Sequence, residues 1–292
     1  MFEINKLSGK TYYFSAFSNV GIFKCSDEEV VLIDTCDHPR MIRTLDRLLG
    51  AKNLKVKTVI NTHCHVDHIA GNKYFSDKYG CELLAPKDEC FFVEHPDFEA
   101  KFYYAGIDTE KSRNPFFCVD PSEPKAIEES ELPKGIEVFP LPGHSFNMVG
   151  VKTEDDVVFL ADAILSKKTW DEHKLPFFHN VNESLETLKS IKNIEGKIFV
   201  PAHDEPTENI KELAEYNIMK MNERKNLVYD ICEGHSFDEM FSILIEELGI
   251  KLVTTKYPMY AIMLRNFLQS LVEDKAIYAK VEDTAKFIYH RN

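Results

Sequence analysis

The sequence predicts an α/β fold with buried sheets, followed by a mostly helical C-terminal extension. In residues 1–205, short apolar runs alternate with helical segments and loops, which is typical of sheets covered by helices. From residue 206 onward, apolar residues recur mostly at helical spacing. The chain is therefore expected to contain an N-terminal region, 1–205, with an aromatic-rich insertion at 91–135, and a C-terminal region, 206–292.

Composition limits the class of protein and its partners. The 292 residues are 44% hydrophobic and 28% charged, which is ordinary globular usage, and the net charge is −13. So acidic a surface repels phosphate groups, which disfavours nucleic acid and anionic membranes as partners. No apolar run approaches the roughly 20 residues of a membrane span. A small-molecule substrate is therefore expected, and homodimer formation is left open.

The N-terminus and the cysteines indicate a compartment. The first residues lack a basic start followed by an apolar block, which predicts no signal peptide. The seven cysteines are irregularly spaced, and none forms a CxxC pair. Free thiols that pack as small hydrophobic residues fit this pattern better than a disulfide framework does. Both observations predict a cytoplasmic protein.

The N-terminal elements follow from local patterns. Strands are expected at 11–14, 21–25 and 30–33, because these runs are apolar and β-prone. A helix is expected at 41–49, where apolar residues share one face and a glycine follows as a stop. Another apolar strand, 56–60, comes next. This alternation of strands and helix indicates the α/β class.

Five apolar runs end in residues of the types that bind metals. Runs of this kind fit strands buried on both faces, and functional residues gather where such strands emerge into loops. If the strands share a direction, all five ends converge on one site. The residues at these ends are Asp34, His63 with His65, His144, Asp162 and His203.

The segment 62–68, which reads THCHVDH, holds three imidazoles and a carboxylate. His63 and His65 point to the same side of an extended chain, because side chains alternate in direction. Two neutral imidazoles on one side are natural ligands for a zinc-like ion. If the chain turns after the valine, Asp67 and His68 face a second position nearby. The residue types and spacing predict metal binding.

Two ions need more ligands than this segment supplies. His144, Asp162 and His203 are the remaining candidates, each at the end of a strand. Asp162 is the best bridge, because its two oxygens can serve two ions. Two-metal hydrolytic sites hold their ions ~3.5–4 Å apart, with a bridging hydroxide as the nucleophile. Taken singly, each residue also has a simpler interpretation as a loop or capping residue.

This combination of motifs resembles the metallo-β-lactamase-fold hydrolase superfamily, which includes the glyoxalase II-like hydrolases. The resemblance covers about residues 10–205. Its motifs, in chain order, are Asp34 in LIDT, HCHVDH at 63–68, His144 in PGHS, Asp162 in LADA and His203 in PAHD.

The resemblance implies a four-layer αββα sandwich with a dinuclear metal site at one edge. It implies two Zn²⁺ ions, with Fe²⁺ or a mixed iron, zinc and manganese site as the alternative. Asp34 would orient a ligand or a loop from behind. The ligand sets it implies share one bridging carboxylate: His63, His65 and His144 with Asp162, and Asp67, His68 and His203 with Asp162.

The activity implied is that of a metal-dependent hydrolase (EC 3 class). A bridging hydroxide would cleave a small ester, thioester, lactone or similar substrate, while Asp67 orients the nucleophile and carries a proton. A mononuclear-iron sulfur (persulfide) dioxygenase stays open, because NTHCHVDH followed by PAHD is similar to that branch. A nuclease or phosphodiesterase also stays open, although the acidic surface counts against it. The predicted lack of an export signal, with Asp162 where some β-lactamases have cysteine, disfavours antibiotic hydrolysis.

The insertion and a later segment carry many aromatic residues. The insertion is interpreted either as a pocket wall or lid, or as a surface subdomain or dimer contact. His173 and His179 follow the Asp162 motif and are expected near the site or at the surface rather than as ligands. The aromatic residues of the insertion are Phe91, Phe92, Phe98, Phe102, Tyr103, Tyr104, Phe116 and Phe117.

The C-terminal region shows its own helix signals. Ser236 and Glu239 form a capping-box pattern before a helix that ends at Gly249, and Pro258 begins another helix. Residues 276–289 then predict a hairpin, so the order resembles a winged-helix module. With 11 basic and 14 acidic residues in 206–292, the region lacks the basic character of a DNA reader. A structural or dimerising role is favoured.

Overall fold

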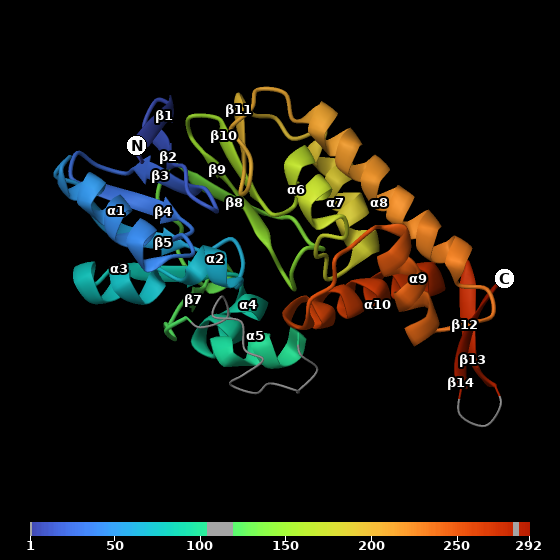
Figure 1. The fold of residues 1–292 in the computed structure, drawn as a ribbon. Helices are drawn as coiled ribbons and strands as arrows, with labels where there is room; N and C mark the ends of the chain where they lie inside the picture. Colours follow the sequence, from blue (N-terminus) through green and yellow to red (C-terminus); the bar gives the residue numbers. More distant parts are fainter. Residues whose placement is uncertain (1, 104–118, 283–285) are drawn as a thin grey trace.

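The computed structural model describes residues 2–103, 119–282 and 286–292 (Figure 1). Eleven strands form two mixed sheets. The first sheet, in spatial order, consists of β1 (Ile4–Ser8), β2 (Thr11–Phe14), β3 (Val20–Lys24), β4 (Glu29–Ile33), β5 (Lys55–Ile60), β6 (Glu82–Ala85) and β7 (Lys125–Ala126). The second consists of β11 (Ile198–Pro201), β10 (Val157–Ala161), β9 (Val149–Thr153) and β8 (Ile136–Pro140).

Helices cover the outer face of each sheet (Figure 1). Helices α1 (Pro39–Gly50) and α3 (Asn72–Tyr79) pack on the first sheet. Between or after the later strands of this sheet, the chain also forms α2 (Val66–Ile69), α4 (Lys87–Glu94), α5 (Pro96–Tyr103) and a short η2 (Ile127–Glu129). Along the second sheet lie α6 (Lys167–His173), α7 (Val181–Ile191) and α8 (Lys211–Ile231). The chain ends with α9 (Phe237–Glu247), η3 (Thr254–Lys256) and α10 (Tyr257–Glu273), and a small sheet of β12 (His235–Ser236), β14 (Lys286–Arg291) and β13 (Ile277–Glu282).

Strand β4 shows how the layers arise from sequence. Val31 and Ile33 point into a core between the two sheets, which contains Phe159 of β10. Val30 and Leu32 point the other way, into a second core with Leu45 of α1. A continuous apolar run is therefore buried on both faces, as the strand period of two requires. The αββα order expected from the sequence is confirmed.

Helix α1 spans the helix expected at 41–49. Proline occupies its first turn, and the His38 side chain accepts a hydrogen bond from the Arg40 N–H at the start of the helix. Leu45 and Leu49 lie fully buried against the first sheet. The strands expected at 11–14, 21–25, 30–33 and 56–60 are β2, β3, β4 and β5. Strand β1 was not expected, because its half-buried residues show little apolar alternation.

The C-terminal region begins with the long helix α8 and packs on the second sheet's helices. A single core joins Leu160 and Trp170 to Met240, Phe267 and their neighbours. The capping box at Ser236 forms as expected, and Gly249 has a left-handed backbone with φ 57° after α9. The hairpin strands β13 and β14 pair as expected, while the turn residue at 283 lies outside the described residues. Helices α9 and α10 are followed by the hairpin, in the order expected. The winged-helix-like module and the boundary at 205 stay predictions.

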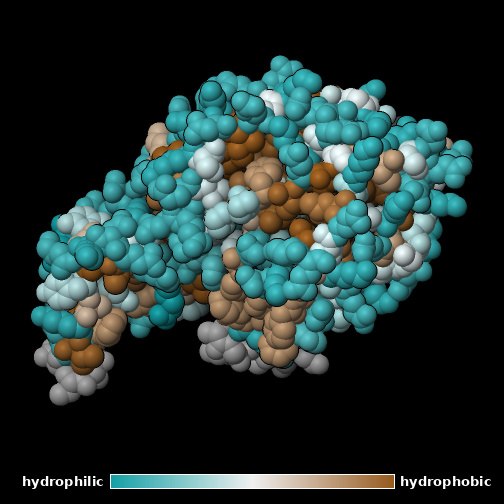
Figure 2. All heavy atoms as spheres, turned by 180° about the vertical axis from the view of Figure 1, so that it is seen from behind, coloured by the Kyte–Doolittle hydropathy of each residue, from teal (hydrophilic) through white to brown (hydrophobic). Residues whose placement is uncertain are grey.

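The face turned away from the view of Figure 1 is mostly hydrophilic. Seen from behind, polar and charged residues cover most of the molecule, and apolar residues gather near its middle (Figure 2). Within the described ranges, every helix is too short or too polar to cross a bilayer.

Hydrogen bonds of the Asn217 side chain, on α8, connect the C-terminal region to the segment that follows β10. Its Oδ1 accepts hydrogen bonds from the Leu165 N–H at 3.0 Å and from Trp170 Nε1 at 2.9 Å. Its Nδ2 donates to the Leu165 carbonyl at 2.8 Å and to the Leu213 carbonyl at 2.9 Å. The side chain is only 1% exposed, so no solvent replaces these bonds. One amide therefore satisfies four buried polar groups.

We expect Asn217→Ala to lower the free energy of unfolding by about 3 kcal/mol, because each buried group left without a partner costs about 1–3 kcal/mol and some relaxation is expected. Urea unfolding followed by circular dichroism measures the change. Asn222→Ala is the matched control, because Asn222 lies on the same helix and is exposed. Equal midpoints for the two variants would contradict the role given to Asn217.

Candidate metal centre

The five strand ends converge because their strands run the same way within each sheet. Strands β4 and β5 are parallel, and so are β10 and β11. Strand β9 is antiparallel to both β8 and β10, so β8 and β10 run in the same direction. The loops that follow these strands therefore meet at one edge of the sandwich.

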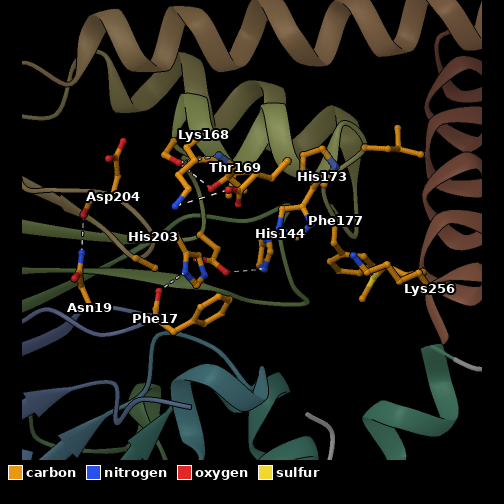
Figure 3. A pocket seen from close by; sticks show the side chains of 18 of the residues that line it. Phe17, Asn19, His144, Lys168, Thr169, His173, Phe177, His203, Asp204 and Lys256 are labelled. Atoms are coloured by element: carbon orange, nitrogen blue, oxygen red, sulfur yellow. Dashed lines mark hydrogen bonds and ion pairs between the residues drawn. The ribbon is translucent and has the colours of Figure 1, made fainter. Parts of the chain in front are cut away.

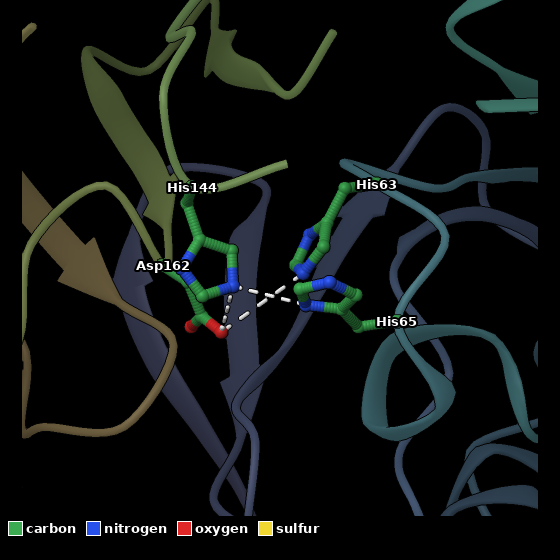
Figure 4. A group of neighbouring side chains, drawn as sticks. All are labelled: His63, His65, His144 and Asp162. Carbon is green, nitrogen blue, oxygen red and sulfur yellow. Dashed lines mark hydrogen bonds and ion pairs between the residues drawn. The ribbon is translucent and has the colours of Figure 1, made fainter. Parts of the chain in front are cut away.

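All seven residues predicted as metal ligands lie at this edge. They form two groups, and within each group one ligand atom per residue lies within 4.8 Å of the others. Asp162 belongs to both groups. Figure 4 shows the first group, in which His63, His65 and His144 surround the Asp162 carboxylate. The second group consists of Asp67, His68, Asp162 and His203.

The separations between ligand atoms fit a tetrahedral ion. His144 Nε2 lies 3.3 Å from Asp162 Oδ2, and His203 Nε2 lies 3.3 Å from Asp162 Oδ1. His203 Nε2 also lies 3.2 Å from Asp67 Oδ2, and His65 Nδ1 lies 2.9 Å from His144 Nε2. Ligands about 2.0 Å from a tetrahedral ion are about 3.3 Å apart. The Asp162 carboxylate contacts both groups, because its Oδ2 lies near His144 Nε2 and 3.6 Å from His68 Nε2, while its Oδ1 faces His203. A carboxylate shared between two ligand groups is suited to bridge two ions.

Buried polar atoms at the centre lack hydrogen-bond partners in the described part of the chain. They include His63 Nε2, His68 Nε2 and Asp162 Oδ1. Such orphaned atoms are rare in folded proteins and need a partner such as an ion. Nitrogen and carboxylate donors in this combination suit zinc, iron or manganese. The residues therefore fit a divalent metal site.

The first group presents neutral imidazoles, which is the form that binds metals. Burial lowers the pKa of His63 well below its usual value, and the neighbouring imidazoles add to this effect. Burial likewise lowers the pKa of His65 to about 4 and that of His144 to about 3.

The second group is dominated by its carboxylates. Burial opposes ionisation of Asp67, but the His68 and His203 rings outweigh it and lower the pKa of this carboxyl well below its usual value. Burial also opposes protonation of His68, but Asp67, with Asp34 and Asp162, raises its pKa well above the usual value. The two carboxylates, Asp67 and Asp162, stay ionised, and their negative charge favours a bound cation.

Asp34 holds the ligands from behind. Its Oδ2 accepts hydrogen bonds from His68 Nδ1 and from Thr62 Oγ1, both at 2.8 Å, and its Oδ1 accepts from the Thr62 N–H at 2.8 Å. The backbone at Asp34 is left-handed, with φ 64°, which is strained for a residue with a side chain. On the other side, His203 Nδ1 donates to the Phe17 carbonyl at 2.8 Å. The bonds at His68 Nδ1 and His203 Nδ1 leave the Nε2 atom of each ring directed toward the second ligand group.

Two buried glutamates near the centre were missed by the sequence analysis. Glu89 of α4 accepts hydrogen bonds from the loops that carry His63, His65 and His144, and Glu99 of α5 lies beside His65. Burial, with the charges of Asp67 and Glu89, raises the pKa of Glu99 well above its usual value. No local signal separates these two acids from the exposed acids around them in the sequence.

The cysteines match their predicted structural role. The six within the described ranges are free, and Cys118 lies outside them. Cys64 stands between two ligands, but burial, followed by the charge of Glu89, raises the pKa of its thiol well above the usual value. It is therefore a thiol and not a thiolate, and it makes no nucleophile.

A cavity of about 600 Å³ opens onto the centre (Figure 3). His144 and His203 lie in its wall, and Phe17 packs edge-on against His203 with ring centres 5.0 Å apart. The centre of the Phe177 ring lies 5.7 Å from the centre of the His65 ring and 5.8 Å from that of the His144 ring. The other apolar lining residues include Leu165, Leu175, Pro176, Pro258, Met259 and Tyr260, and its two lysines are Lys168 and Lys256.

The described part of the insertion does not line this cavity. Its residue Phe92 stacks on Phe146 with ring centres 4.7 Å apart, and β7 extends the first sheet. Tyr104, Phe116 and Phe117 lie outside the described residues, as does the side chain of Tyr103. His173 lines the cavity, and His179 packs on Phe146, so neither belongs to the two ligand groups.

Comparison with known proteins places this architecture. A family model described as "Metallo-beta-lactamase superfamily" matches residues 16–203. Among curated relatives, a hydroxyacylglutathione hydrolase of Prochlorococcus marinus is 26% identical over 147 residues, which are 48% of this chain and 47% of that protein. A beta-lactamase-like protein 2 homolog of Drosophila melanogaster is 26% identical over 202 residues, 68% of this chain and 62% of that protein. The chain thus spans about half to three-fifths of the length of these relatives.

Solved structures share the fold. A metallo-beta-lactamase family protein from Thermus thermophilus superimposes with a TM-score of 0.71 at 17% identity, covering 100% of this chain and 98% of that one. A beta-lactamase domain protein from Burkholderia ambifaria gives a TM-score of 0.73 at 16% identity, covering 99% and 93%. The DIM-1 metallo-beta-lactamase superimposes with a TM-score of 0.59 at 18% identity, and the superposition covers 76% of this chain and 97% of that one.

Proposed function

The chain belongs to the metallo-β-lactamase superfamily, and on that premise we propose that it is a dinuclear zinc hydrolase of a small ester, thioester or lactone. The observation that carries the proposal is the position of Asp162, whose carboxylate belongs to both ligand groups and contacts His144 in one and His68 and His203 in the other. A carboxylate shared in this way supports two ions rather than one. The hydrolase named among the relatives supports the reaction class.

The cavity favours a small-molecule substrate over a polymer. Its volume of about 600 Å³ lies in the range of small-molecule pockets. Two phenylalanines, Phe17 and Phe177, flank the histidines of the centre. The net charge of −13 works against binding a nucleic-acid backbone.

The protein's own residues divide the work of the reaction. When bound, the ions would polarise the substrate carbonyl and lower the pKa of a water molecule. His63, His65 and His144 would hold one ion, while Asp67, His68 and His203 would hold the other. Asp67 would also orient the attacking water and carry its proton, because its buried carboxylate stays ionised. Leu165, Phe177 and Met259 would exclude bulk water from the reacting carbonyl.

We expect about two zinc ions per chain in protein purified without added metal, with hydrolysis of at least one member of a panel of thioesters, lactones and phenyl esters. Elemental analysis and a thiol or proton-release assay measure these two outcomes. Asp67→Asn is expected to lower kcat/KM by at least about 10²-fold, which is the usual lower bound for losing a proton-carrying group.

Two results would overturn this proposal. About one iron per chain, with oxygen consumed in the presence of glutathione persulfide, would identify the dioxygenase alternative. Cleavage of bis(p-nitrophenyl) phosphate or of RNA, with no carbonyl substrate cleaved, would identify a phosphodiesterase. Asp97→Asn, an exposed acid on α5, is the control for a general effect of losing a carboxylate.

A further inference from the structure

We propose that Glu89 and Glu99, from the helix pair α4–α5, are positioning residues that assemble the first ligand group and set its affinity for metal. This inference concerns how the ions are held, not which substrate is cleaved, and it rests only on the metal centre of the proposed function. It also gives Glu99, which lies in the described part of the insertion, a role that neither interpretation from sequence provided.

Glu89 joins the two loops that carry the first group. Its Oε2 accepts a hydrogen bond at 3.1 Å from the N–H of Cys64, which lies between His63 and His65. Its Oε1 accepts from the Asn147 N–H at 2.8 Å and from the Ser145 hydroxyl, just after His144. The side chain is fully buried. One carboxylate therefore fixes the distance between the two loops.

Glu99 lies beside His65. His65 Nδ1 faces His144 Nε2 at 2.9 Å, so this nitrogen is directed at the first ion position. The other ring nitrogen, Nε2, lies 3.7 Å from Glu99 Oε1. Glu99 is 3% exposed, and its Oε2 has no hydrogen-bond partner among the described residues. A carboxyl group behind the non-ligating nitrogen of a metal-binding histidine orients the ring.

The second group is held by different residues. His68 is bonded to Asp34 at 2.8 Å, and His203 to the Phe17 carbonyl at 2.8 Å. The Asp67 carbonyl accepts from the Ser18 hydroxyl. These partners come from loops after β2 and β4, while Glu89 and Glu99 come from α4 and α5. Substitutions of the two glutamates should therefore lower the metal affinity of the first ligand group more than that of the second.

Zinc-loaded full-length protein, titrated with a competing chelator, tests this inference. We expect Glu99→Gln to lower the affinity for one of the two ions by about 10–100-fold, the usual effect of losing such a partner, and the other by less than about 3-fold. Glu89→Gln should act on the same ion, because an amide cannot accept hydrogen bonds at both ends. Glu94→Gln, on α4 but away from the centre, is the matched control and should change neither affinity.

A second readout separates positioning from a loss of structure. In protein labelled with ¹⁵N-histidine and loaded with zinc, Glu99→Gln should shift one imidazole N–H resonance, that of His65, and leave the others within their normal spread. Unchanged affinities and spectra would overturn the inference while leaving the proposed function intact. Equal loss of both ions, with a lowered melting temperature, would also overturn it. A wild-type protein that binds no metal would overturn both proposals.

Discussion

Asp162→Asn is expected to lower kcat/KM by at least about 10³-fold, which corresponds to about 4 kcal/mol of transition-state stabilisation. The physical reason is the double contact of this carboxylate. Its Oδ2 lies 3.3 Å from His144 Nε2, 3.6 Å from His68 Nε2 and 3.9 Å from His63 Nε2. Its Oδ1 lies 3.3 Å from His203 Nε2. Asparagine offers one oxygen and no charge, so it cannot bridge two cations.

The metal content should change together with the activity. Elemental analysis of the Asp162→Asn protein should give about one ion per chain or fewer, against about two for the wild type. Asp156→Asn is the control, because Asp156 precedes β10, is partly exposed and pairs with Lys197 at 3.1 Å. Two ions and near wild-type turnover in the Asp162→Asn protein would show that the two groups do not share a bridging ligand.

This centre was predictable from sequence because its ligands lie next to strongly patterned strands. Short β-branched runs such as 30–33 predict buried strands, and the residues that follow them emerge at the sheet edge. Asp162 and His203 are separated by 41 positions, yet β10 and β11 are parallel neighbours, so their ends must coincide. Residues that are distant in the sequence but follow neighbouring parallel strands are therefore close together in the fold.

Other parts of the site could not be predicted in this way. Glu89 and Glu99 resemble surface acids in sequence, and only the packing of α4 and α5 buries them. The cavity wall combines Phe177 with Met259 and Tyr260, residues that meet because α10 returns to the site. In that contact, the Asn266 amide donates to the Phe178 carbonyl at 2.7 Å. Contacts of this kind depend on tertiary packing, and the local sequence pattern does not predict them.

The same contact assigns a role to the C-terminal region. Met263 and Asn266 of α10 hold the backbone of Phe178, next to the ring of Phe177 that packs on His65 and His144. Thr255, Lys256 and residues 258–260 complete the cavity. The structural role favoured from sequence is therefore consistent with these contacts, and it extends to shaping the pocket. Dimer formation stays a prediction.

Removal of the metal ions is the second change for which we expect a large effect. A chelator should lower the melting temperature of the wild-type protein by about 10 °C or more. An ion present at 1,000 times its Kd stabilises the native state by about 4 kcal/mol. One kcal/mol corresponds to about 2–4 °C for a domain of this size class. Two ions held by seven mostly buried side chains should reach this value readily.

The expected loss of thermal stability has a second cause in the buried polar atoms that the ions would contact. Without the ions, the buried atoms His63 Nε2 and His68 Nε2 have no hydrogen-bond partner among the described residues. Such groups are costly in the native state and are solvated after unfolding. Chelation thus removes the binding free energy and exposes this penalty at the same time.

Differential scanning calorimetry with and without chelator measures the shift, and added zinc should restore the original melting temperature. The Asp162→Asn protein provides the matched comparison, because it should bind fewer ions and therefore respond less to the chelator. A wild-type melting temperature that moves by less than about 2 °C would mean under about 1 kcal/mol of stabilisation by metal. That outcome would contradict a tightly held dinuclear centre, since ions bound so weakly would not occupy both ligand groups at working concentrations.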